Sequence, residues 1–119
     1  MKVQRGDVVL VDFPYSDRTG SKVRPALVVQ SDTWNQPLDD TILAMVSCSN
    51  RRRVGAATQH LIAASSTVAH GTGLRMDSII QCENLVTYDQ GLILRVLGRL
   101  PDSETKHIDV CLKAALAIP

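Results

Sequence analysis

Short apolar runs separated by polar segments occupy most of the chain, up to about residue 100. β-Branched and other aliphatic residues dominate these runs, and Pro14 closes the first of them. The pattern predicts six short strands, at residues 8–13, 26–30, 41–48, 60–63, 78–82 and 93–97. The segments between them are polar or rich in small residues. We expect turns or loops at residues 16–22, 31–40, 49–57 and 65–73.

The C-terminal segment has a helical period instead. Residues 101–104 read as a helix start, with a capping side chain and a carboxylate in the first turn. Apolar side chains then recur on one face, at Ile108, Cys111, Leu112, Ala115 and Leu116. Short strands followed by one amphipathic helix predict a mainly β (α+β) fold. We expect a small, partly open β-barrel with the C-terminal helix packed against it.

Length and composition suit an ordinary globular protein. The 119 residues, 45% apolar and 21% charged, predict one domain spanning residues 1–119 with one hydrophobic core. Aromatic residues make up only 3% of the chain, so this core should be aliphatic. No charged segment followed by a long apolar stretch opens the chain, and its apolar runs are far shorter than a membrane span. We expect no membrane association.

Three cysteines, Cys48, Cys82 and Cys111, lie far apart in the sequence. An odd number at such spacing favours reduced thiols in a cytoplasmic protein over a disulfide framework. Cys48 and Cys82 fall in apolar, strand-like segments, where we expect them to be small buried side chains. No Cys or His spacing indicates a metal site.

The net charge is only +1, so the chain as a whole attracts nucleic acid weakly. A nucleic-acid site would have to be a local cationic patch. Arginines and lysines gather in two places, the turn with Arg18, Lys22 and Arg24 and the run at Arg51, Arg52 and Arg53. Such a run is usually a solvated loop, but this one closely follows Ser47 at the end of a predicted strand.

Arg24 stands where the polar turn meets the second apolar strand. Its guanidinium is a planar, permanently charged fork that matches phosphate oxygens. Pro25 biases Arg24 toward extended backbone geometry, which limits where the side chain can reach. The ordinary alternative is a surface ion pair at a strand start.

An ordered set of segments carries a resemblance over nearly the whole chain. These are RGDVVLVDF, GSKVRPALVVQSD, TILAMVSCSN, GLRMDSIIQCENLVTYDQGLIL and the closing helix. The set resembles the MazF/PemK toxins, the ribonuclease halves of bacterial toxin–antitoxin pairs. The resemblance implies an SH3-like barrel, which that family shares with CcdB, a toxin that poisons gyrase. Fold alone therefore does not fix the target.

The resemblance also implies an activity and partners. It implies a sequence-selective, metal-independent endoribonuclease that cuts single-stranded RNA without a cofactor and stops translation and growth. It implies a homodimer with RNA in the dimer groove, and a small MazE-like antitoxin whose acidic segment folds over the cationic site. Two alternatives stay open. One is a CcdB-like toxin that binds a protein such as gyrase, and the other is a barrel module that only binds RNA or protein.

Candidate catalytic residues follow from the resemblance. The family's Arg-Pro arginine corresponds to Arg24, which would stabilise the charged phosphorane. Its strand-three hydroxyl corresponds best to Ser47, with Ser49 as a competitor; a strand-end serine can also simply bond the backbone. One branch of the family carries Arg-x-Asp where this chain has Gln81-Cys82-Glu83, so Glu83 keeps the carboxylate. Glu83 could equally be structural.

The remaining predicted RNA contacts are polar or cationic side chains near these positions: Ser16, Asp17, Arg18, Lys22, Ser49, Arg51, Arg52, Arg53, Arg75 and Gln81. His60 and His70 are further titratable groups near neutrality, although a lone loop histidine is usually just solvated. Because aromatic stacking platforms are few, hydrogen bonds to base edges should select the RNA sequence.

Overall fold

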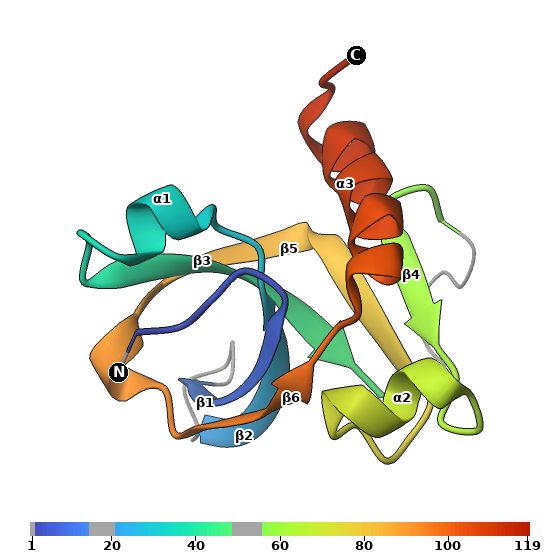
Figure 1. Ribbon diagram of the computed structural model, residues 1–119, viewed down its shortest axis with the longest axis horizontal. Coiled ribbons are helices and arrows are strands. Elements are labelled where there is room, and N and C mark those ends of the chain that lie inside the picture. The colour runs from blue at the N-terminus through green and yellow to red at the C-terminus, as the bar shows by residue number, and fades with distance from the viewer. Residues whose placement is uncertain (1, 15–20, 49–55) are drawn as a thin grey trace.

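The computed structural model describes residues 2–14, 21–48 and 56–119 (Figure 1). Six described strands form one antiparallel sheet in the order β4-β5-β3-β2-β1-β6. Their bounds are β1 Asp7–Pro14, β2 Ser21–Val28, β3 Asp40–Ser47, β4 Gln59–Ile62, β5 Ser78–Asp89 and β6 Arg95–Arg99. The six predicted strands are therefore present, with shifted ends.

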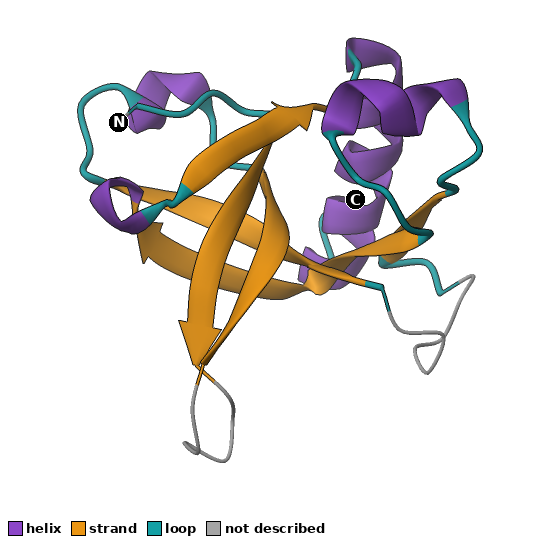
Figure 2. Cartoon of the chain, turned by 90° about the horizontal axis from the view of Figure 1, so that it is seen from below, coloured by secondary structure: helices purple, strands orange, loops and turns teal. Residues whose placement is uncertain are grey.

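The sheet curls because two of its strand pairs are irregular. Between Ala44 and Met45 of β3, the partner positions on β5 jump from Leu85 to Gln81, so β5 carries extra residues there. A second shift lies between Val8 and Val9, where β1 pairs with β6. Such bulges bend a strand and increase its twist. Figure 2 shows the resulting half-barrel, with short helical segments on the left and the larger helices on the right, and the predicted fold class is confirmed.

Two short helices occupy segments predicted as loops. Helix α1 spans Asp32–Asn35 and α2 spans Thr67–Thr72. Each begins after a serine whose hydroxyl accepts a backbone N–H: Ser31 from Thr33 at 3.2 Å, and Ser66 from Ala69 at 3.3 Å. A single capped turn is too short to show an apolar period, which explains why the sequence pattern missed both. A 3₁₀ turn, η1 at Gln90–Leu92, links β5 to β6.

Helix α3 spans Asp102–Leu116, as predicted, but its start differs from the prediction. Pro101 is the N-cap and no side chain caps the helix; Asp102 and Glu104 supply only charge in the first turn. On the predicted apolar face, Ile108 and Cys111 are buried. Leu116 is exposed because the end of α3 projects beyond the sheet (Figure 1). No helix in the described residues is long and apolar enough to cross a membrane.

The sheet buries apolar side chains on both faces, so the described residues hold two cores and not the single core predicted. The helix-side core lies between the sheet and helices α2 and α3, and includes Val8, Leu27, Val46, Ile80 and Ile108. The barrel core lies on the other face and comprises Val3, Val9, Val11, Ala26, Val28, Leu43, Met45 and Ile93. Neighbouring residues such as Val8 and Val9 alternate between them.

Gln90 is a buried polar side chain at the end of the barrel core. Its Oε1 accepts the N–H of Val3 at 2.9 Å. Its Nε2 donates to the carbonyls of Asn35 at 2.9 Å and Leu38 at 3.0 Å. One amide therefore ties the N-terminal segment and the α1 region to η1.

The cysteines divide into a buried pair and an exposed one. Cys82 and Cys111 are both buried in the helix-side core. Cys48 is exposed, so the prediction that it is buried is wrong. It follows the last residue of β3, beyond the part of the sheet that both cores cover.

This environment predicts which thiols react. Burial raises the pKa of Cys82 from 9.0 to about 12, and burial also raises the pKa of Cys111. Folded Cys82 keeps its thiol proton up to a higher pH than Cys82 of the unfolded chain. The stability that this difference contributes is fully present at neutral pH. It falls as pH rises from 9.0 towards about 12. We expect a thiol reagent at mildly alkaline pH to label Cys48 alone, counted by mass spectrometry, and labelling of Cys82 in native protein would contradict this.

Candidate active site

Arg24 and Ser47 lie on neighbouring antiparallel strands, Arg24 within β2 and Ser47 at the end of β3. The ladder between β2 and β3 runs from Val28–Leu43 to Ala26–Met45. Arg24 and Ser47 are each two residues beyond the last pair of this ladder, so a continuation of its register would set them opposite each other. Because side chains alternate, both belong to the face of the barrel core. Ser47 is buried and Arg24 half-buried.

The sequence around Pro25 accounts for this local geometry. Pro25 lies opposite Leu10 of β1 and has no N–H to donate to a neighbouring strand. The β2–β3 ladder stops at Ala26, the residue next to it. Arg24 is thus fixed by β1 on one side, while its other side is released from backbone pairing with β3.

Gln81 lies on the same face, one step further into the sheet. It pairs with Met45 of β3 on one side and with Gln59 of β4 on the other. Met45 is two residues from Ser47, a distance of about 7 Å along a strand. Gln81 Nε2 and Gln59 Oε1 are buried and have no hydrogen-bond partner within the described residues. A donor on β5 and an acceptor on β4 therefore lie on this face without a partner in the described residues. Sequence reasoning missed Gln59, because only its pairing with Gln81 in the sheet places it on this face.

Glu83 lies in the irregular part of β5 and is exposed. Its two carboxylate oxygens accept hydrogen bonds from Thr58 Oγ1 at 3.0 Å and Gln59 Nε2 at 2.8 Å. These bonds tie the bulge to the start of β4. The Glu83 carboxylate thus orients the Gln59 amide.

Several predicted contacts lie outside the described residues: Ser16, Asp17, Arg18, Ser49, Arg51, Arg52 and Arg53. Lys22 is in β2, but its side chain is also outside the description. The choice of Ser47 over Ser49 therefore stays a prediction.

His60 lies away from this face. It pairs with Ile80, a member of the helix-side core, and its Nε2 is 3.2 Å from Glu104 Oε1 of α3. Its ring stacks on His107, with centroids 5.2 Å apart and planes at 8°. This cluster docks α3 on β4. No group of three or more His, Cys, Asp or Glu side chains within the described ranges could hold a metal ion.

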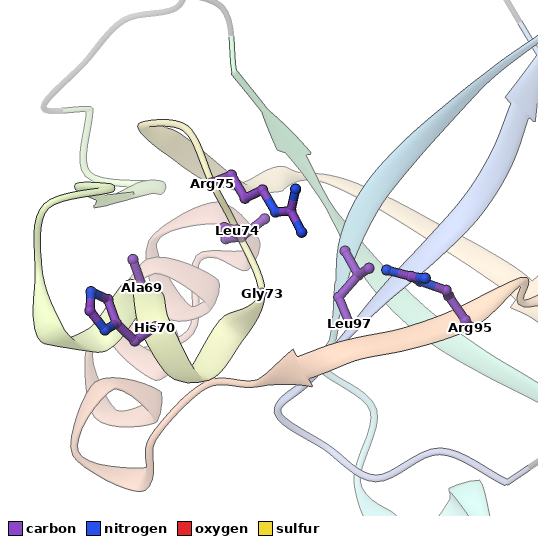
Figure 3. A pocket seen from close by; sticks show the side chains of 7 residues that line it. All are labelled: Ala69, His70, Gly73, Leu74, Arg75, Arg95 and Leu97. Carbon is purple, nitrogen blue, oxygen red and sulfur yellow. The ribbon is translucent and has the colours of Figure 1, made fainter.

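Arg75 lies in a separate pocket of about 530 Å³ (Figure 3). The pocket is on the helix-side face and is lined by Ala69, His70, Gly73, Leu74, Arg75, Arg95 and Leu97. The structure thus does not bring Arg75 together with Gln81, and it reveals a second cation, Arg95. Sequence reasoning passed over Arg95 because it falls inside an apolar run that reads as a strand.

Comparison with known proteins settles the family. Residues 4–116 match the family of PemK-like, MazF-like toxins of type II toxin–antitoxin systems. The chain belongs to this family. Endoribonuclease MazF2 of Mycobacterium bovis is 27% identical over 117 residues, covering 98% of both chains. Endoribonuclease MazF6 of Mycobacterium tuberculosis matches to the same extent.

Solved structures agree on the fold. An endoribonuclease in complex with its cognate antitoxin from a mycobacterial species has a TM-score of 0.77 at 20% identity, covering 98% of this chain and 97% of that one. MazE–MazF from Deinococcus radiodurans has a TM-score of 0.73 at 17% identity, with 100% of both chains covered. The gyrase-poisoning alternative gains no support from these relatives.

Proposed function

We propose that this chain is an endoribonuclease toxin that cuts single-stranded RNA by making the ribose 2′-hydroxyl attack the adjacent phosphate. The observation that supports the proposal is the β2–β3 register, which brings Arg24 and Ser47 to the same sheet face, each two residues beyond the last pair, Ala26–Met45. A permanently charged donor and a hydroxyl on neighbouring strands suit one phosphodiester. The relatives named endoribonuclease support the same activity.

The reaction needs positioning and charge more than a protein nucleophile. A base takes the proton of the 2′-hydroxyl, whose oxygen forms a bond to phosphorus. The bond from phosphorus to the 5′-oxygen breaks, and an acid protonates that oxygen. The products carry a 2′,3′-cyclic phosphate and a 5′-hydroxyl. Arg24 stabilises the doubly charged phosphorane and Ser47 donates to a phosphate oxygen. Glu83 is the carboxylate we propose for proton transfer.

The same face supplies groups for reading RNA. Gln81 lies opposite Met45, two residues from Ser47, and Gln59 lies opposite Gln81 on β4. We propose that these two amides bond a base edge or ribose hydroxyl. The polar turn at residues 16–22 and the arginine run at residues 51–53 follow directly on the ends of β1 and β3. We propose that they hold the flanking strand.

The family also supports proposals about partners. Two of the related structures contain an antitoxin together with the toxin. We propose that this chain forms a homodimer in the cytoplasm and is held inactive by a MazE-like antitoxin, whose acidic segment covers the cationic site.

Ser47→Ala should slow RNA cutting about tenfold, because loss of one hydrogen bond to the reacting phosphate costs about 1.4 kcal/mol. Ser47→Thr keeps the hydroxyl and should retain most of the rate. Single-turnover cleavage of a defined RNA measures both. Equal rates for the alanine and threonine variants would remove Ser47 from the mechanism.

The activity itself is tested by incubating purified protein with RNA and with DNA of the same sequence in EDTA. Discrete RNA fragments with intact DNA are expected, because DNA lacks the attacking hydroxyl. RNA binding without cutting would favour a pure binding module. Gyrase inhibition without cutting would restore the alternative.

A further inference from the structure

We propose that the pocket between α2 and β6 binds a backbone phosphate of the RNA substrate outside the cut, through Arg75 and Arg95. This inference rests on the proposed function. Figure 3 shows the two arginines approaching the pocket from opposite sides, with Leu97 between them. Nothing in the reaction described above uses this pocket.

The two walls of the pocket are in backbone contact, so the pocket is already formed without a ligand. Gly73 ends α2 with a φ of 77°, and a Cβ there would be 2.5 Å from the Leu97 carbonyl oxygen. A Cβ on Gly98 would be 2.3 Å from the Gly71 carbonyl oxygen. Only glycine permits these approaches. Arg75 follows Gly73 by two residues, and Arg95 lies on the opposing strand.

The pocket is cationic, and its charge is not neutralised by the protein. Its lining holds two arginines and His70 but no aspartate or glutamate. Within the part of the chain that the structure describes, Arg5 pairs with Asp109 at 2.6 Å and Arg99 with Asp7 at 3.1 Å. Neither Arg75 nor Arg95 has such a pair there. Two unpaired guanidiniums facing one cavity are suited to a phosphate.

The sheet connects both arginines to the candidate active site. Arg95 lies opposite Leu10, which lies opposite Pro25, the residue after Arg24. Two strand spacings are about 10 Å. Arg75 precedes β5 by three residues, and Ile79 near the start of β5 pairs with Ser47. The pocket therefore lies at the same end of the sheet as the Arg24–Ser47 pair.

The pocket and the candidate active site lie on different faces of the sheet, so an RNA must be long enough to reach both. Arg24 belongs to the barrel-core face, whereas Arg95 pairs with Leu10 between the barrel-core residues Val9 and Val11 and so belongs to the helix-side face. One strand of RNA reaches both only by passing the end of the sheet, where β2 and β3 are no longer paired. A short RNA that covers only the cut should not reach the pocket.

The test compares RNAs of about five and about sixteen nucleotides that contain the same cut site. Arg75→Gln/Arg95→Gln should raise KM about tenfold for the long RNA and leave the short RNA and kcat unchanged. The slope of log KM against log salt for the long RNA should fall by about 0.7 for each phosphate that the variant no longer neutralises. Lys106→Ala/Lys113→Ala, which removes two exposed charges from α3, should change neither KM nor this slope.

A melting temperature close to wild type shows that the glutamine variant is folded, and Arg75→Lys/Arg95→Lys gives a second variant that keeps the charges. Unchanged KM and salt slope for the long RNA in the glutamine variant overturn the inference. So does a loss of affinity for a glutamate-rich peptide with unchanged RNA binding, which would assign the pocket to a protein partner. Failure of wild-type protein to cut any RNA would instead overturn the proposed function.

Discussion

Arg24→Ala should reduce RNA cutting a hundredfold or more, roughly, and leave the fold intact. The side chain is the cation that the β2–β3 register brings to the sheet face of Ser47, and removal of one donor that stabilises transition-state charge costs on this order. It makes no ion pair within the described residues, so its loss should barely change the melting temperature. Single-turnover cleavage rates and thermal unfolding measure the two effects.

Two further variants test whether the loss of cutting is specific to the Arg24 guanidinium. Arg24→Lys keeps the charge without the fork and should recover only part of the rate. Arg99→Ala removes an arginine of the edge strand β6 that pairs with Asp7, and should cut RNA at the wild-type rate. Full activity in Arg24→Ala would overturn the assignment of Arg24.

Gln90→Leu should lower the free energy of unfolding by roughly 3–5 kcal/mol. The substitution keeps the side-chain volume but leaves the Val3 N–H and the Asn35 carbonyl buried without their partner. Urea denaturation measures the loss.

Gln36→Leu, at an exposed position after α1, is the matched control and should change stability by less than about 0.5 kcal/mol. Gln90 also bonds the Asp40 carbonyl at the start of β3, whereas Ser47 ends that strand about 24 Å away. Folded Gln90→Leu protein should therefore still cut RNA. Similar stabilities for the Gln90 and Gln36 variants would show that the buried amide contributes little.

The sequence pattern predicts the strands well but not how they bend. Residues 78–82 read as a complete strand because Glu83 and Asn84 are polar, yet β5 continues to Asp89. The polar residues sit in the bulge, where the strand turns and its side chains face solvent. The two short helices were missed for a different reason, since each depends on a single serine cap.

The site is less predictable from sequence because strand register is a tertiary property. No spacing shows that the β2–β3 register brings Arg24 and Ser47 to one sheet face, and a shared site for the two was expected only through the family resemblance. Gln59 and Arg95 belong to no motif, and only the pairing of β4 with β5 and of β6 with β1 gives them neighbours. Gln90 looks like a loop residue until the N-terminal segment and the α1 region converge on it.

The chemistry of the cut is tested most directly with an RNA that carries one 2′-deoxyribose immediately 5′ of the mapped cleavage position. In EDTA, the unmodified RNA should yield fragments that end in a 2′,3′-cyclic phosphate and begin with a 5′-hydroxyl, identified by mass spectrometry. The RNA with the single deoxyribose should stay intact at that position while still binding. Cutting of this RNA there, or fragments that begin with a 5′-phosphate, would contradict attack by the ribose hydroxyl.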